Sequence, residues 1–93
     1  MFNKYELPSI TLHESNPGHN FERNFRLNEA HAPLFINADS LQYSAAPSLP
    51  SKHTAFIEGW GLYSEFLGIE MGMYDNDTMS LYGYHGAQLL RAA

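Results

Sequence analysis

Residues 52–71 read KHTAFIEGWGLYSEFLGIEM, and this stretch decides the fold class of the chain. Apolar side chains recur along it at steps of three and four residues, which is typical of a helix that buries one face. They are Ala55, Phe56, Trp60, Tyr63, Phe66, Leu67 and Met71. Gly59, Gly61 and Gly68 lie in the same stretch, and each costs roughly 1 kcal/mol relative to alanine in a helix. We therefore expect a helix over about 52–71 whose glycines pack closely against a neighbouring element.

The sequence on either side of this stretch predicts further helices. Apolar residues recur at helical spacing through about 7–27, but the Pro17-Gly18 pair interrupts them, so we expect a helix that is broken at 17–18. Another helix is expected over about 79–93. The proline-rich segment between the first two helices predicts a long loop over about 28–51. The expected fold is all-α, with two to three packed helices.

Composition limits both the size of the fold and its partners. The chain has 93 residues, enough for one small domain, and 44% of them are hydrophobic, which favours a packed interior over a disordered tail. Its net charge of −5 and its lack of a basic cluster argue against a nucleic-acid partner. No apolar run approaches the length of about 18 residues that a membrane span needs, and the first residues do not resemble a signal peptide. The compartment stays open.

Two histidines lie on either side of the expected helix break. His13 and Glu14 are adjacent, and His19 comes six positions after His13. Adjacent His and Glu with another His nearby is an arrangement that offers two imidazoles to zinc and a carboxylate to the water bound there. On an uninterrupted helix, however, a six-residue step leaves the imidazoles about 120° apart. A zinc site therefore requires Pro17-Gly18 to turn His19 back towards His13.

A third metal ligand is available from the helix expected over 52–71. Because the chain has no cysteine, histidines and carboxylates would have to hold a metal. Glu58 is a carboxylate on an otherwise apolar helix, where an ionised side chain needs a cation or a hydrogen-bond network. Glu65 lies roughly 10 Å further along the same face, so one of the two binds the ion and the other supports it from outside. We favour Glu58 as the ligand. The alternative is a solvated helix face for both glutamates and a capping or surface role for the histidines.

Three stretches of the chain, taken in order, resemble the family called domain of unknown function 885. They are LHESNPGH at 12–19, TAFIEGWGLYSE at 54–65 and LGIEMGMY at 67–74. The resemblance covers nearly the whole chain, but the family's domain is several times longer, so the chain is similar to its C-terminal catalytic portion. Members of this family look like helical zinc peptidases of the gluzincin type.

The resemblance implies a role for each residue of the motif. His13, His19 and Glu58 would bind Zn²⁺, and Glu14 would act as the general base. The family commonly has a further histidine directly after the second ligand, and Asn20 stands in that place here.

Two functions follow from these expectations. The first is the zinc-binding core of a metallopeptidase that hydrolyses peptide bonds with metal-activated water, and a peptide is then the substrate. The alternative is a truncated, catalytically inactive fragment that acts as a structural or interaction piece. In either case the apolar helix faces need covering, either by the remainder of a larger catalytic domain or by self-association.

Overall fold

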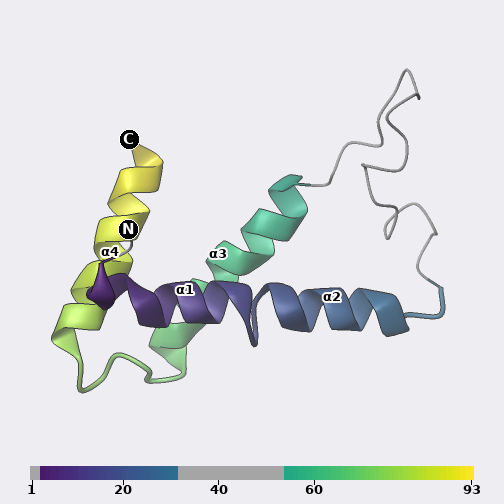
Figure 1. The fold of residues 1–93 in the computed structure, drawn as a ribbon, viewed down its shortest axis with the longest axis horizontal. Coiled ribbons are helices and arrows are strands. Elements are labelled where there is room, and N and C mark those ends of the chain that lie inside the picture. Colours follow the sequence, from purple (N-terminus) through teal and green to yellow (C-terminus); the bar gives the residue numbers. More distant parts are fainter. Residues whose placement is uncertain (1–2, 32–53) are drawn as a thin grey trace.

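The fold comes from a computed structural model that describes residues 3–31 and 54–93. A short 3-10 helix, η1 (Lys4–Glu6), leads into α1 (Leu7–Glu14), and then follow α2 (His19–Asn28), α3 (Thr54–Glu70) and α4 (Thr78–Ala92) (Figure 1). Every regular element within the described ranges is helical, so the predicted all-α class is confirmed. The loop expected over about 28–51 lies mostly outside these ranges.

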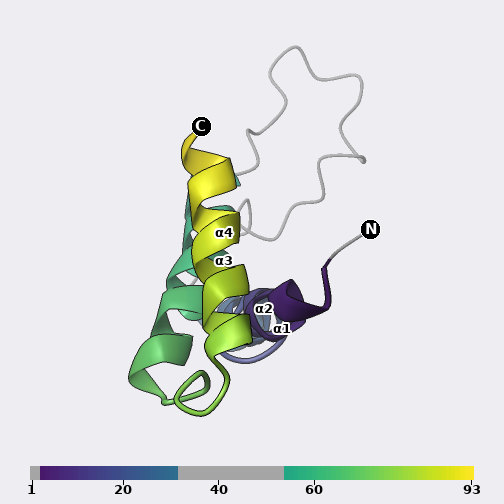
Figure 2. The same ribbon diagram turned by 90° about the vertical axis from the view of Figure 1, so that its left-hand side faces the viewer.

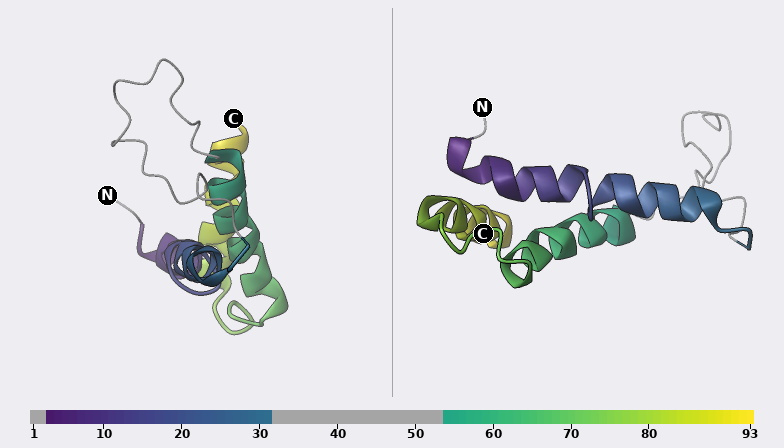
Figure 3. Two further views of the ribbon diagram at one scale, coloured as in Figure 1. Left: turned by 90° about the vertical axis from the view of Figure 1, so that its right-hand side faces the viewer. Right: turned by 90° about the horizontal axis from the view of Figure 1, so that it is seen from below.

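The helices form two layers. Helices α1 and α2 continue nearly in line as one interrupted rod, and α3 and α4 lie against one side of that rod (Figure 3). Seen along the rod, α3 and α4 both run across its direction (Figure 2). Helix α3 packs against both α1 and α2, whereas α4 packs against η1 and α1. The junction between α1 and α2 therefore lies over α3.

The interruption of the rod has a local chemical cause. Pro17 has no N–H to donate within a helix, and the Asn16–Pro17 peptide bond is cis. The carbonyl of Ser15 accepts hydrogen bonds from the backbone N–H groups of Asn20 and Phe21 in the first turn of α2, at 3.2 and 3.4 Å. A Cβ added at Gly18 would lie 1.9 Å from the carbonyl oxygen of His13, so the backbone passes α1 where other residues do not fit.

The buried apolar core of the described chain is small. Leu12, Tyr74 and Tyr84 form it, with Leu81 packed against them. A Cβ at Gly68 would lie 2.4 Å from Leu12 Cδ1, so this glycine lets α1 and α3 approach closely. Many other large apolar side chains remain exposed, among them Phe21, Phe25, Phe56, Tyr63, Phe66, Met71, Tyr82, Leu89 and Leu90.

The expectation that all three glycines of α3 are closely packed holds in part. Gly61 faces the imidazole ring of His13, and Gly68 faces Leu12. At Gly59 an added Cβ would meet nothing within 4 Å among the described residues, so the expectation is wrong there. Gly59 is exposed.

Asp77 caps the N-terminus of α4, where the connection from α3 ends. The Asp77 carboxylate accepts a hydrogen bond of 3.0 Å from the backbone N–H of Ser80 and one of 2.7 Å from its hydroxyl. These bonds lower the pKa of Asp77 below its ordinary value, as expected for an acceptor at a helix N-terminus. None of the described helices is long and apolar enough to cross a membrane.

Burial of Tyr84 predicts a loss of stability at alkaline pH. Burial raises the pKa of its hydroxyl above 10.0, and the charge of Glu65 raises it further. Because the folded state holds this proton more tightly, the stability contribution is complete below pH 10.0 and is lost as the pH rises through the folded-state pKa.

We expect the thermal midpoint to fall less steeply in Tyr84→Phe than in the unaltered chain when the pH rises from about 9 to about 11.5. Tyr82, whose side chain is 70% exposed, provides the matched control in Tyr82→Phe. Circular dichroism melts at several pH values measure the difference. Parallel pH profiles for Tyr84→Phe and Tyr82→Phe would contradict this assignment.

Candidate metal centre

The turn between α1 and α2 brings the two motif histidines together. His13 lies in the last turn of α1, and His19 is the first residue of α2. Their ring centroids are 4.6 Å apart, with the ring planes at 88° to each other. The divergence of about 120° that a continuous helix would impose is therefore absent. Trp60 ties this turn to α3, since its indole N–H donates a hydrogen bond of 2.7 Å to the carbonyl of Pro17.

Glu58 of α3 completes a group of three possible metal ligands. Its Oε2 atom lies 3.2 Å from His13 Nε2 and 3.6 Å from His19 Nε2. One ligand atom from each of the three residues lies within 4.8 Å of the others. The histidine side chains are 14% and 22% exposed and that of Glu58 is 54% exposed. The group therefore has a sheltered side at the histidines and a solvent-facing side at the glutamate.

The donor set of this group suits zinc chemically. Two imidazole nitrogens and one carboxylate oxygen are a ligand combination found in catalytic zinc sites, which keep a further position for water or substrate. Ca²⁺ and Mg²⁺ prefer sites made of oxygen atoms. The exposed flank of Glu58 leaves room for such an additional ligand.

Gly61 creates the space that His13 occupies against α3. A Cβ added there would lie 2.5 Å from His13 Nε2 and 2.6 Å from its Cε1. These distances are far below van der Waals contact, so another residue at this position would displace the ring. The sequence indicated close packing at Gly61 but not the identity of the neighbour.

Glu65 and Glu58 lie on opposite sides of the His13 ring. Its side chain is 2% exposed, and its Oε1 lies 2.7 Å from His13 Nδ1. Its Oε2 accepts hydrogen bonds from the Ser9 hydroxyl at 3.0 Å and from Arg91 Nη2 at 2.7 Å. The two glutamates of α3 thus contact different nitrogens of one imidazole, with Glu58 at Nε2. Glu65 is outside the group of three.

The other motif residues lie nearby without joining the group. Glu14 follows His13 directly and is exposed, and its carboxylate makes no hydrogen bond or ion pair with the other residues that the structure describes. Asn20 is exposed and shares its side-chain hydrogen bonds with Asn16 and Asn24 along the rod. The Nδ1 atom of His19 is buried and has no hydrogen-bond partner within the described ranges.

Two residues that contact Glu65 were not found from the sequence. Ser9 and Arg91 both donate hydrogen bonds to Glu65. A buried carboxylate on an apolar helix does signal that a cation is near, but Arg91 lies on another helix and no spacing rule connects it to Glu65. His31 and His85 are outside the group, as their isolation in the sequence indicated, and His53 is outside the described residues.

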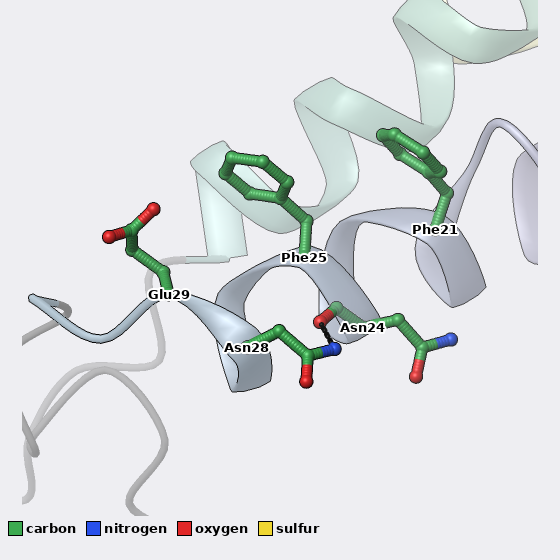
Figure 4. A pocket seen from close by; sticks show the side chains of 5 residues that line it. All are labelled: Phe21, Asn24, Phe25, Asn28 and Glu29. Carbon is green, nitrogen blue, oxygen red and sulfur yellow. Dashed lines mark hydrogen bonds between the residues drawn. The ribbon is translucent and has the colours of Figure 1, made fainter.

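A surface hollow lies along α2. It is lined by Phe21, Asn24, Phe25, Asn28 and Glu29 (Figure 4). Figure 4 shows the two phenylalanine rings on one side of the helix and the two asparagines on another, where the amide of Asn28 donates to the carbonyl of Asn24 at 2.8 Å. The Phe21 ring also stacks on that of Trp60, with centroids 6.4 Å apart. None of the three possible ligands lines this hollow.

The fold and the group together define an all-helical protein with two histidines and one glutamate gathered at its surface. The chain belongs to the family described as Bacterial protein of unknown function (DUF885), whose sequence profile matches residues 1–93. No curated protein and no solved structure matches the chain. Because the family description states no activity, an activity has to be argued from the residues of the group.

Proposed function

We propose that His13, His19 and Glu58 bind Zn²⁺ and that the chain is the zinc-binding core of a metallopeptidase. The observation that carries this proposal is the approach of both imidazole Nε2 atoms to the same carboxylate oxygen, at 3.2 and 3.6 Å. The three residues come from three helices, so folding is needed to bring them together. Two ring nitrogens and one carboxylate oxygen that converge in this way are a donor set suited to Zn²⁺.

The remaining residues suit hydrolysis of a peptide bond. Zinc at the group supplies Lewis-acid activation of water and of the scissile carbonyl. Glu14 is next to His13 in the chain and exposed, so its carboxylate is available to accept a proton from the attacking water and to deliver it to the leaving amine. The solvent-facing side at Glu58 gives a peptide access to the group.

The exposed apolar side chains support a partner for this core. Leu89 and Leu90 are 74% and 80% exposed at the end of α4, and Phe56 is 57% exposed on α3. Apolar exposure of this extent is typical of surfaces that are covered by other protein. The remainder of a larger catalytic domain is the covering that we propose, with self-association as the alternative.

A peptidase assay tests the proposed activity. The zinc-loaded chain, incubated with a mixed peptide library, is expected to cleave peptides, and Glu14→Gln is expected to reduce the rate about 10²–10⁴-fold because the proton acceptor is lost. Zinc affinity should be unchanged in this variant, since Glu14 is outside the ligand group. Glu29→Gln, at an exposed position just after the C-terminal end of α2, is the matched control.

The same assay separates the alternative function. Absence of cleavage by a chain that holds zinc would contradict the peptidase proposal and favour a non-catalytic structural or interaction piece. Equal cleavage by the unaltered chain and Glu14→Gln would contradict the role of Glu14.

A further inference from the structure

The buried carboxylate of Glu65 joins the candidate metal centre to the far end of α4. Arg91, in the last turn of α4, donates from Nη2 to Glu65 Oε2 at 2.7 Å. Ser9 of α1 donates to the same oxygen at 3.0 Å. The other carboxylate oxygen, Oε1, lies 2.7 Å from His13 Nδ1. A carboxylate that is 2% exposed thus has its three contacts divided between its two oxygens.

From this division of contacts we propose that Arg91 is a positioning residue for the metal centre, acting through Glu65 on the tautomer of His13. The proposal rests on the proposed zinc site. It adds a residue of α4, 26 positions from Glu65 in the sequence, that sets which nitrogen of the histidine is free to bind a metal.

In the neutral imidazole of His13, one ring nitrogen carries the proton and the other does not. An ionised carboxylate only accepts hydrogen bonds, and a neutral imidazole has a single N–H, so His13 can donate to only one of the two carboxylates that it contacts. The contact of Nδ1 with Glu65 Oε1, at 2.7 Å, is shorter than that of Nε2 with Glu58 Oε2, at 3.2 Å, so we assign the proton to Nδ1 and the lone pair to Nε2. A histidine that donates from one nitrogen to a carboxylate and binds metal through the other is a common arrangement in zinc proteins.

The Arg91 guanidinium and the Ser9 hydroxyl orient the carboxylate of Glu65. Burial of an unpaired carboxylate is costly, and the guanidinium of Arg91 provides the compensating charge. An arginine has donors and no acceptor. Together with Ser9 it therefore fixes Oε2 as an acceptor and leaves Oε1 for His13.

Replacing Glu65 by glutamine is expected to reverse the tautomer of His13. With Arg91 present, the amide oxygen of the new side chain should face the guanidinium and the hydroxyl of Ser9. The amide NH₂ group then points at His13 Nδ1 and donates to it. This arrangement would move the imidazole proton to Nε2 and block the atom that faces Glu58. Without Arg91 the amide can turn over, and the original tautomer becomes available again.

The experiment measures the His13 tautomer in the metal-free protein. Long-range ¹⁵N–¹H correlation spectra, recorded at a pH alkaline enough to keep imidazoles neutral, distinguish a proton on Nδ1 from one on Nε2. We expect Nδ1–H in the unaltered chain, Nε2–H in Glu65→Gln and a mixture in Arg91→Met. Arg91→Lys retains a charged donor and should keep Nδ1–H. Arg23→Met, at an exposed arginine of α2, should match the unaltered chain.

Zinc affinity, measured by competition with a chelator, is the second readout. We expect Arg91→Met and Glu65→Gln each to weaken binding about 10–100-fold, the range for residues that orient a ligand. The double variant that combines Glu65→Gln with Arg91→Met should bind zinc more tightly than Glu65→Gln alone. If the role of Arg91 is merely structural, Arg91→Met should lower the melting temperature without changing the tautomer of His13.

The outcomes separate this inference from the proposed function. An unchanged tautomer in both Glu65→Gln and Arg91→Met would overturn the role of Arg91, whether or not zinc binds. If the tautomer shifts as expected but the unaltered chain has no affinity for zinc, the positioning network stands and the zinc proposal fails. Glu65→Gln keeps the shape of the native side chain, so the test does not depend on folding of the arginine variant.

Discussion

Replacing Gly18 by alanine is expected to break the junction between α1 and α2. An added Cβ would lie 1.9 Å from the carbonyl oxygen of His13 and 2.2 Å from that of Leu12. Both neighbours are backbone atoms of α1, so no side chain can rotate to relieve the overlap. We expect the free energy of unfolding to fall by at least about 3 kcal/mol, at the upper end of what overpacking costs.

Chemical denaturation followed by circular dichroism measures this loss. The matched control is Gly86→Ala on α4, where an added Cβ meets nothing within 4 Å among the described residues. That variant should be neutral or more stable by up to about 1 kcal/mol, because alanine favours helix over glycine. Equal stability of Gly18→Ala and Gly86→Ala would show that the turn does not need its glycine.

Replacing Gly61 by alanine is expected to remove zinc affinity while largely preserving the fold. The new methyl group would lie 2.5 Å from His13 Nε2 and 2.8 Å from its Cδ2. In contrast to Gly18, the obstructed atoms belong to a side chain, so the ring can move away and the helices can stay packed. Moving the ring takes Nε2 away from Glu58. We expect zinc affinity to fall by about 100-fold or more, beyond the range for residues that only orient a ligand.

The control for this prediction lies on the same helix. Gly59→Ala introduces the same methyl group two positions earlier, where the added Cβ would have no atom of the described residues within 4 Å. Its zinc affinity should equal that of the unaltered chain, and chelator competition measures both variants. If Gly61→Ala binds zinc as tightly as Gly59→Ala, His13 is not held against α3 in the way described.

Local chemistry allowed part of this fold to be predicted from the sequence. Pro17 lacks the N–H that a continuing helix needs, and α1 ends before the Pro17-Gly18 pair and α2 begins after it. The apolar periodicity of residues 52–71 corresponds to α3 from Thr54 to Glu70. In both cases the signal lies within a few residues of the feature that it predicts.

Contacts between separate helices could not be predicted in the same way. The sequence placed Glu58 and Glu65 on one face of a helix, but it could not show that one imidazole lies between them. The bond from Arg91 to Glu65 joins two helices whose relative placement no periodicity determines. Gly59 and Gly61 look equivalent in the sequence, yet only the neighbour of Gly61 makes glycine necessary there.

Elemental analysis of the zinc-loaded chain after gel filtration tests the central claim most directly. The unaltered chain should retain about one zinc ion, as expected for a site with three protein ligands. His13→Ala should retain far less, whereas His85→Ala, which changes an exposed histidine outside the group, should retain as much as the unaltered chain. Equal retention of zinc by the unaltered chain and by His13→Ala would contradict the proposed metal centre.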